Sequence, residues 1–159
     1  MSGLALGRLT EERKTWRKDH PFGFNAKPAT NKDGSMNLFL WNCSIPGKEG
    51  TAWQGGLYPV TIHFSEDYPS KSPLCSFPGK FFHPNVFENG QICLSILGND
   101  WKPSISVKQI LLGIQDLLDT PNPNSPAQTY AYELFVKQKD KYRTKVEEQA
   151  KRFPVLDEL

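Results

Sequence analysis

The stretch "SVKQILLGIQDLLD", residues 106–119, decides how the rest of the chain is interpreted. Ser106 and Gln109 have the Ser-x-x-Gln form of a capping box, which predicts that a helix starts here. Apolar residues then recur at the three- and four-residue spacing of one helix face. They are Val107, Ile110, Leu111, Ile114, Leu117 and Leu118. We therefore expect the central buried helix of the fold at this position.

The segments that precede this helix have the composition and length of strands. Residues 36–45 (MNLFLWNCSI), 57–64 (LYPVTIHF) and 74–77 (LCSF) are rich in apolar and β-branched residues, and turn-rich sequence separates them. Residues 20–28 (HPFGFNAKP) are also turn-rich. Short turns between consecutive strands favour antiparallel pairing of neighbours. We expect a meander of two or three strands.

Two more helices are expected after the turn-rich stretch at residues 120–126 (TPNPNSP). Ser125 is the predicted N-cap, Pro126 the predicted first helical residue, and Gln128 the reciprocal partner of the cap. On the last helix, an apolar stripe predicts which side chains face inward. These are Tyr142, Val146 and Phe153.

The order of these elements predicts an α+β protein. It would have an N-terminal helix, an antiparallel β-meander, a central helix and two C-terminal helices. A length of 159 residues suits a single domain, residues 1–159, that needs no disulfide or structural metal. The first segment turns charged after a few apolar residues, and no later run could span a bilayer. We expect an intracellular protein that does not bind membranes.

Three cysteines make an odd count, and they are widely spaced. This pattern fits neither a disulfide framework nor a zinc site, so we expect free thiols and no bound metal. Cys43 and Cys75 fall inside expected strands, where a thiol packs like a small apolar side chain. Cys93 is left as the candidate reactive cysteine.

Basic residues are concentrated in the first twenty positions. A helix would stack two pairs of them on one side, Arg13 with Arg17 and Lys14 with Lys18. The inward-facing residues of that helix would be Leu6, Leu9 and Trp16. The charge indicates either a basic docking face or an ordinary solvated surface. The net charge of +2 is too small to argue for nucleic-acid binding.

The stretch "HPNVFENGQICLSIL", residues 83–97, places Cys93 without an obvious base. A cysteine hydrolase needs an oriented histidine, but His83 precedes Pro84 in a turn, where an imidazole more often holds loop backbone. An acyl carrier has no such need, because thioester exchange releases another thiolate. Asn85 could stabilise the oxyanion when an amine attacks the thioester, or it could be an ordinary turn asparagine.

Several motifs together resemble the ubiquitin-conjugating enzyme family, which carries ubiquitin-like proteins as thioesters. They are "QGG" (54–56), "FSEDYPSKSP" (64–73), "HPNV" (83–86), "NGQICLSIL" (89–97) and Trp-x-Pro (101–103). The resemblance covers nearly the whole chain. It implies that Cys93 accepts the acyl group and that Asn85 stabilises the oxyanion or supports the active-site loop. It also implies that His83, Phe87, Ser125, Gln128 and Tyr132 support the site and position the lysine.

Within the family, four segments are most similar to the SUMO-conjugating members: residues 8–24, 33–38, 45–56 and 110–118. The similarity implies that SUMO is carried on Cys93 and transferred to substrate lysines. The expected partners are SUMO, the heterodimeric SUMO-activating enzyme, SUMO ligases and protein substrates. Contacts to SUMO and the activating enzyme would use Arg13, Lys14, Arg17 and His20. The enzyme would need no cofactor, because the activating enzyme consumes the ATP, and it would be located in the nucleus and cytoplasm.

Some positions near the cleft depart from the SUMO-conjugating pattern. Ser125 replaces an aspartate, Phe87 replaces a tyrosine, and Leu74 and Ser76 replace basic residues. Recognition of an acidic residue beyond the target lysine is therefore in question, although Asn89 and Gln91 could contact the substrate motif. The loop at residues 97–101 is about two residues shorter and resembles the ubiquitin type. The alternatives are a conjugating enzyme for ubiquitin or another ubiquitin-like protein, and a non-catalytic variant of the fold, which Cys93 argues against.

Overall fold

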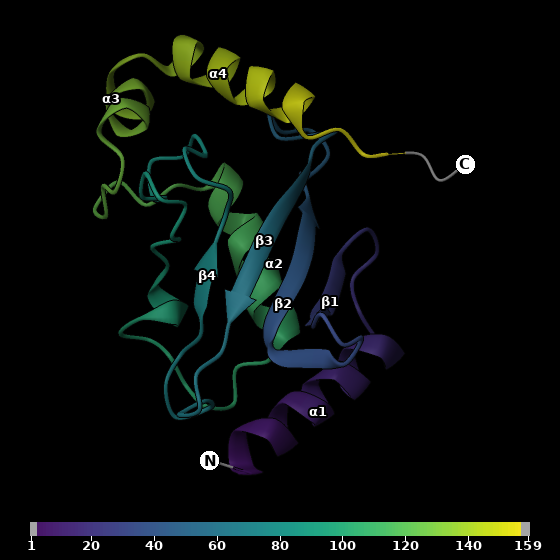
Figure 1. Ribbon diagram of the computed structural model, residues 1–159. Coiled ribbons are helices and arrows are strands. Elements are labelled where there is room, and N and C mark those ends of the chain that lie inside the picture. Colours follow the sequence, from purple (N-terminus) through teal and green to yellow (C-terminus); the bar gives the residue numbers. More distant parts are fainter. Residues whose placement is uncertain (1–2, 157–159) are drawn as a thin grey trace.

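The computed structural model describes residues 3–156, which form helices at both ends of the chain and an antiparallel sheet between them (Figure 1). The expected order of an N-terminal helix, a meander, a central helix and two C-terminal helices is confirmed. The elements are α1 (Gly3–Lys18), β1 (Asn25–Thr30), β2 (Met36–Pro46), β3 (Leu57–His63), β4 (Leu74–Ser76), the 3₁₀ helix η1 (Ser95–Leu97), α2 (Val107–Asp119), α3 (Thr129–Lys137) and α4 (Lys139–Arg152).

The sheet has the strand order β1-β2-β3-β4, with every neighbouring pair antiparallel. It contains one strand more than expected, because the segment predicted to be a turn forms β1. This strand lies at the sheet edge and pairs with β2, for example Ala26 with Cys43. Its register shifts between Pro28 and Ala29, and an edge position with such an irregularity tolerates proline. The turn-like composition therefore misled the prediction.

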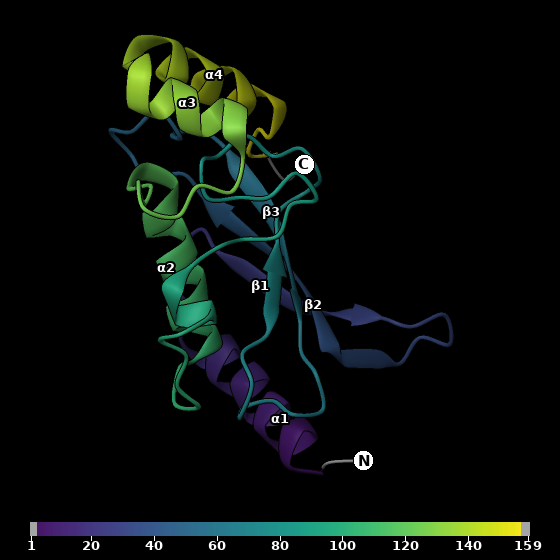
Figure 2. The same ribbon diagram turned by 90° about the vertical axis from the view of Figure 1, so that its left-hand side faces the viewer.

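The central helix α2 lies across one face of the sheet (Figure 2). Its capping box is confirmed, since Gln109 N–H donates to Ser106 Oγ at 3.1 Å and Ser106 N–H donates to Gln109 Oε1 at 2.8 Å. All six apolar residues predicted to face inward are buried. Burying a leucine or isoleucine side chain contributes about 1.5–3 kcal/mol. This face of α2 is thus a main source of the core.

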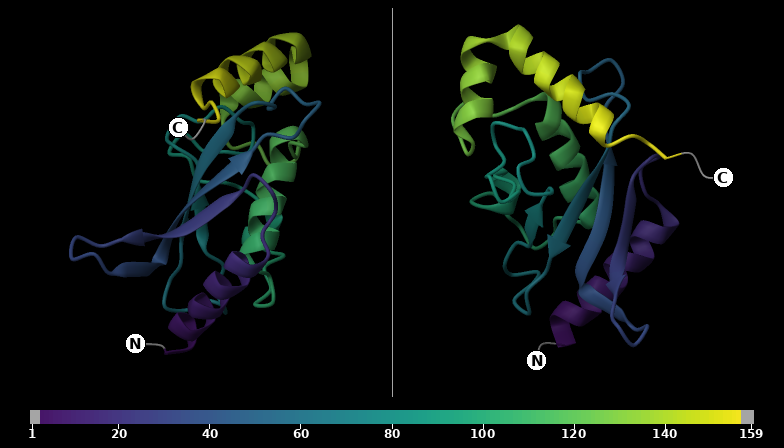
Figure 3. Two further views of the ribbon diagram at one scale, coloured as in Figure 1. Left: turned by 90° about the vertical axis from the view of Figure 1, so that its right-hand side faces the viewer. Right: turned by 45° about the horizontal axis from the view of Figure 1, so that its top comes forward.

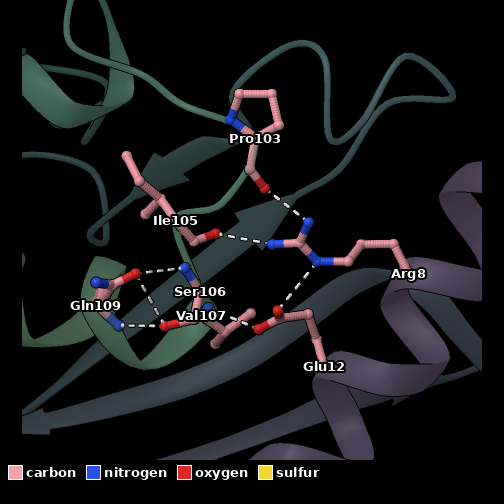
Figure 4. Close-up of polar contacts among 7 residues, drawn as sticks. All are labelled: Arg8, Glu12, Pro103, Ile105, Ser106, Val107 and Gln109. Carbon is pink, nitrogen blue, oxygen red and sulfur yellow. Dashed lines mark hydrogen bonds and ion pairs between the residues drawn. The ribbon is translucent and has the colours of Figure 1, made fainter.

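Two side chains of α1 bind backbone groups around the start of α2 (Figure 4). The Arg8 guanidinium donates to the carbonyls of Pro103 at 2.6 Å and Ile105 at 3.1 Å. The Glu12 carboxylate accepts the N–H of Val107 at 2.8 Å and also pairs with Arg8 at 3.1 Å. An acidic group at a helix N-terminus is favourable because it satisfies a free N–H. Arg8 thus joins α1 to α2.

The inward face of α1 is only partly as expected. Leu9 and Trp16 are buried, but Leu6 is 42% exposed, and Ala5 takes the buried position instead. Ala5 and Leu9 are four residues apart, so they lie on one face. The sequence pattern did not distinguish Leu6 from Ala5, because both are apolar.

The start of α3 differs from the prediction. The helix begins at Thr129, so Ser125 is not its N-cap and Pro126 is not its first residue. Gln128 is also not the partner of a cap, since it occupies the N-cap position itself and its side chain makes no capping bond. Backbone groups in this segment are used in tertiary contacts instead, such as Ala127 N–H to the carbonyl of Pro84 at 2.9 Å. These contacts keep residues 125–127 outside the helix, which begins only at Thr129.

The last two helices lie together at the end of the molecule opposite to α1 (Figures 1 and 3). Of the three residues predicted to face inward, Val146 is fully buried, whereas Tyr142 and Phe153 are partly buried against the core. None of the helices within residues 3–156 combines the length and the apolar character needed to cross a membrane.

Candidate active site

Cys93 lies at the end of a loop that folds back along the sheet edge. Isolated antiparallel bridges join Val86 to Ile92 and Ser76 to Gln91, so the loop extends the sheet beyond β4. The N–H of Cys93 donates to the carbonyl of Asn85 at 2.9 Å, which fixes the backbone of the cysteine. The Cys93 side chain is partly exposed, unlike those of the other two cysteines.

A groove of about 650 Å³ opens beside Cys93. One wall is the loop that contains Asn99 and Asp100, and the other contains Asn122 and Ser125. Asp116 of α2 also lines it. This groove is the natural place for a group that reacts with Cys93.

The Asn85 side chain is buried and fully occupied. Its Nδ2 donates to the carbonyls of Asn122 at 2.9 Å and Ser125 at 2.7 Å, and its Oδ1 accepts the N–H of Asn122 at 2.8 Å. A side-chain amide has only two N–H donors, and both are used here. Of the two roles considered for Asn85, this geometry favours support of the loop over donation to an oxyanion.

His83 is completely buried and holds the same loop. Its Nε2 donates to the carbonyl of Leu117 at 2.7 Å, in the last turn of α2, and its Nδ1 accepts the N–H of Asn85 at 3.0 Å. Burial lowers the pKa of His83 to about 4, so the imidazole is neutral at pH 7. With both nitrogens occupied, His83 is a loop support and not a base for Cys93.

Gln128 and Tyr132 bind backbone carbonyls of two loops near the site. The buried Gln128 amide donates to the carbonyls of Phe81 at 2.8 Å and Val86 at 3.1 Å. The Tyr132 hydroxyl donates to the carbonyl of Pro123 at 2.9 Å. Gln128 is therefore a buried support of the site, and its amide is not available to an incoming lysine.

Phe87, Asn89 and Gln91 lie at the outer tip of the loop that leads to Cys93. Phe87 is 41% exposed, which leaves an apolar surface for a substrate. The Asn89 side chain accepts the N–H of Gln91 at 2.9 Å, and the Gln91 carbonyl accepts the N–H of Phe87 at 2.9 Å. These bonds give the tip a defined shape.

A second groove, of about 550 Å³, lies between α1 and β1. Three of the four predicted docking residues line it, Arg13, Arg17 and His20, and Lys27 of β1 joins them. We call the part of the groove lined by these four residues the basic groove. Lys14, the fourth predicted residue, is not among its lining residues and forms an ion pair with Glu11 at 3.6 Å.

The His20 ring in the basic groove is held by its own helix. It stacks on Trp16 with ring centroids 5.1 Å apart, and its Nδ1 is 2.8 Å from the Trp16 carbonyl. A protonated Nδ1 donates to this carbonyl and leaves Nε2 free for a partner. The basic groove therefore presents an imidazole held by Trp16 next to the cationic side chains of Arg13, Arg17 and Lys27.

The sequence as a whole matches a known protein family, and this match agrees with the geometry around Cys93. Residues 8–150 match the family described as "Ubiquitin-conjugating enzyme". The chain belongs to the ubiquitin-conjugating enzyme family. Such a long match includes most of α1, the sheet, the Cys93 loop, α2 and α3, and most of α4.

Relatives of this ubiquitin-conjugating enzyme match nearly its full length. SUMO-conjugating enzyme SCE1 of Arabidopsis thaliana is 61% identical over 157 residues, which cover 98% of each chain. Sumo-conjugating enzyme ubc9 of Dictyostelium discoideum is 58% identical over 156 residues, covering 97% of this chain and 98% of the relative. SUMO-conjugating enzyme UBC9 of Caenorhabditis elegans is 54% identical over 155 residues, covering 96% of this chain and 93% of the relative.

The other two thiols of this ubiquitin-conjugating enzyme are buried, as expected. Burial raises the pKa of Cys43 to about 12 and also raises the pKa of Cys75 above its ordinary value. Both remain protonated at neutral pH and are poor nucleophiles. Within residues 3–156, no cluster of three or more His, Cys, Asp or Glu side chains could hold a metal ion.

Sequence reasoning missed three residues of the two grooves. Asn122 binds Asn85 through its backbone groups, so no side-chain motif could indicate this contact. Lys27 is an isolated lysine in a segment expected to be a turn. Asp116 occupies an exposed position of α2 and forms an ion pair with Lys48. Only the position of Asp116, on the outer face of a clearly amphipathic helix, could have indicated its exposure.

Proposed function

We propose that this enzyme conjugates SUMO to proteins. Cys93 takes SUMO from the activating enzyme as a thioester, and the enzyme then transfers it to a substrate lysine as an isopeptide bond. The main support for this chemistry is the partly exposed Cys93 thiol, which lies beside a groove. His83 is held by the carbonyl of Leu117 and cannot act as a base for this thiol. The choice of SUMO is supported by three nearly full-length relatives that bear this name.

The first step is thioester exchange. The Cys93 thiolate attacks the carbonyl carbon of the SUMO thioester on the activating enzyme, and the thiolate of the activating enzyme leaves. The reaction exchanges one thioester for another, so it needs neither a redox partner nor a strong base. The enzyme itself uses no cofactor in this step, because the activating enzyme consumes the ATP.

The second step is aminolysis. The Nζ atom of a substrate lysine attacks the thioester carbonyl, loses a proton to solvent, and expels the Cys93 thiolate. A free lysine has a pKa of about 10.4, so the amine must be deprotonated and brought into line with the thioester. Ser125 lines the groove beside Cys93, and we propose that it positions the amine together with Phe87 and Tyr132. Positioning of this kind can supply several kcal/mol of the barrier.

Asn85 acts in this scheme as a positioning residue. It ties the Cys93 loop, through the carbonyl that binds Cys93 N–H, to the opposite groove wall at Asn122 and Ser125. The position of the Cys93 loop relative to this wall determines how a lysine side chain reaches the thioester. His83 and Gln128 hold the same loop from below.

The basic groove is the proposed contact for SUMO and for the activating enzyme. Arg13, Arg17, His20 and Lys27 would meet an acidic partner surface, since complementary charge accelerates and orients association. SUMO ligases are proposed as further partners. We place the enzyme in the nucleus and cytoplasm, in line with a protein-modifying role.

Ubiquitin is the second candidate modifier, and the short loop favours it. Residues 97–101 are closed by local bonds and held by two outside contacts. Ser72 Oγ donates to the carbonyl of Leu97 at 2.8 Å, and Trp101 Nε1 donates to the carbonyl of Pro69 at 2.9 Å. A loop fixed in this way cannot adapt to a partner that needs a longer one.

The decisive experiment mixes the enzyme with ATP and either the SUMO- or the ubiquitin-activating enzyme and its modifier. Products are separated on non-reducing gels, with Cys93→Ala as the control that cannot form a thioester. A thiol-sensitive adduct with SUMO alone supports the proposal. An adduct with ubiquitin alone rejects it in favour of the second candidate, and no adduct with either rejects both and leaves another ubiquitin-like protein or a non-catalytic variant.

A further inference from the structure

The segment that follows Cys93 lies directly against the middle of α2. Leu94 is the extended residue before η1, and Ile96 lies within η1. Gly113 of α2 faces both side chains, since a β-carbon at Gly113 would lie 3.0 Å from Ile96 Cδ1 and 3.6 Å from Leu94 Cδ2. Ordinary contacts between carbon atoms are about 3.5–4.0 Å long. Even a methyl group at position 113 would therefore push Ile96 away from the helix.

Gly113 is an unfavourable residue for the helix that contains it. It lies in the interior of α2, where glycine loses more conformational freedom than alanine when the helix forms. Its backbone does not have the positive φ that favours glycine, so its conformation does not require this residue. The close approach of η1 to α2 is the feature that accounts for a glycine at this position.

The backbone of Cys93 is held from both sides. Its N–H donates to the carbonyl of Asn85 at 2.9 Å, and the next residue, Leu94, packs partly buried against the core. The N–H of Leu97 donates to the carbonyl of Leu94 at 2.9 Å and closes η1. The Ser72 hydroxyl holds the far end of η1 by donating to the carbonyl of Leu97 at 2.8 Å. Because the far end is held, a push on η1 is transmitted to Leu94 and Cys93.

The contact between η1 and α2 also shapes the groove beside the thiol. Cys93, Leu94 and Gly113 all line this groove of about 650 Å³. Attack on a thioester requires the reacting atoms to come within about 3–3.5 Å of each other in an aligned geometry, so a small misplacement lowers the rate. The spacing between η1 and α2 therefore affects the chemistry of transfer as well as the packing.

We propose that Gly113 is a positioning residue for the transfer of the modifier to lysine. The missing side chain lets Leu94 and Ile96 lie against α2, and this spacing sets the position of the Cys93 thioester in the groove. Gly113 acts through these two side chains. This inference rests on the proposed function, since it concerns the transfer step of that reaction.

The test compares Gly113→Ala with Gly7→Ala, its matched control in α1. Among the described residues outside the adjoining turns of α1, no heavy atom lies within 4 Å of a β-carbon at Gly7. Gly7→Ala therefore gains the helix preference of alanine without a new contact, and it should raise the melting temperature by about 2–4 °C. Gly113→Ala should raise it by less, because Ile96 must move. Thermal melting measures both shifts and shows that both variants fold.

The main readout is the rate of lysine transfer. The Cys93 thioester is formed with SUMO, or with ubiquitin if only ubiquitin loads, and is isolated. Single-turnover transfer is then measured over a range of concentrations of a lysine peptide. We expect Gly113→Ala to lower the maximal rate about 5-fold without changing the peptide concentration at half-maximal rate, because alignment changes and acceptor binding does not. Gly7→Ala should leave both values unchanged.

Ile96→Val supplies a rescue of the Gly113→Ala variant. Valine lacks Cδ1, the atom that lies 3.0 Å from the β-carbon position of residue 113. The double variant should recover about half of the wild-type maximal rate or more, and Ile96→Val alone should stay within about twofold of the wild type, since residues in contact show non-additive effects. A variant that merely filled the groove would not be rescued in this way.

The outcomes separate this inference from the proposed function. Transfer by Gly113→Ala at the wild-type rate overturns the inference, and so does an equal loss in Gly7→Ala or a double variant as slow as Gly113→Ala. In these cases the wild-type enzyme still loads and transfers, so the proposed function stands. Loading with ubiquitin alone rejects SUMO as the modifier, while the variants still test Gly113. Failure of the wild type to load either modifier rejects both, since no transfer step would remain.

Discussion

Asn85 and Asn122 form a reciprocal pair of hydrogen bonds between two loops of the active site. The Asn85 amide donates to the Asn122 carbonyl at 2.9 Å, and the Asn122 N–H returns a bond of 2.8 Å to the Asn85 oxygen. The loop that carries Cys93 is thereby fixed to the opposite wall of its groove. The same pair of bonds therefore stabilises the fold and positions Cys93 for transfer of the modifier.

Asn85→Ala should slow lysine transfer about 100-fold while leaving thioester formation on Cys93 largely intact. The variant loses three hydrogen bonds, each with a net contribution of about 0.5–1.5 kcal/mol. Pulse-chase assays separate the two steps. Asn122→Ala is the control, because it keeps the backbone groups that bind Asn85, and it should retain transfer. Selective loss of charging in Asn85→Ala would contradict the assignment.

Cys93 should be the single thiol that reacts in the folded enzyme. Burial and the raised pKa values of Cys43 and Cys75 protect those two residues. Treatment with iodoacetamide at pH 8 should add one label, at Cys93, as read by mass spectrometry, and denaturant should allow labelling of the other two. Cys93→Ser should form an oxyester or no adduct. Unchanged thiol-sensitive loading of this variant would disprove the role of Cys93.

His83 should make the enzyme less stable in acid. Its pKa is about 4 in the folded protein against an ordinary 6.5, so the unfolded chain binds a proton first as the pH falls. The contribution is complete above pH 6.5 and is lost progressively towards pH 4, by up to about 3 kcal/mol. Urea unfolding at several pH values measures it. His83→Gln, which can still donate to Leu117, should lack this part of the pH dependence; an unchanged dependence would refute the explanation.

Ser125→Ala should lower the free energy of unfolding by less than about 0.5 kcal/mol, because Ser125 is not the helix cap that its sequence context predicted. Its hydroxyl accepts one bond, from the Asn122 amide at 3.2 Å. Ser125→Asp should speed lysine transfer several-fold, since an anion in the groove attracts the ammonium group. Chemical denaturation and single-turnover assays test the two statements. A loss near 1 kcal/mol in Ser125→Ala would restore the capping interpretation.

Arg8→Met should lower the free energy of unfolding by about 2 kcal/mol. It removes the guanidinium that binds two carbonyls before α2 and leaves Glu12 with one partner fewer. Thermal or chemical denaturation measures the loss. Lys14→Met is the matched control on α1, because Lys14 forms only an exposed ion pair, and it should change stability little. Equal effects of the two substitutions would show that the α1–α2 contact is not stabilising.

The elements that the sequence predicted well depend on residues close together in the chain. The capping box of Ser106 and Gln109 spans three positions, and the apolar face of α2 repeats every three or four. Cys93 could be singled out because the other two cysteines lie in strand-like segments. In each case the interactions that determine the structure act within one element or follow from composition, so the sequence is sufficient to predict it.

What only the tertiary structure decided depends on partners far away in the chain. Asn85 meets Asn122 across 37 positions, and this contact makes it a support with no free amide donor. The turn-like residues 25–30 become a strand because β2 offers them backbone partners, and the segment at Ser125 stays outside the helix because Asn85 and Pro84 bind its backbone. Backbone groups take whichever hydrogen-bond partner the fold presents, and the local sequence does not specify that partner.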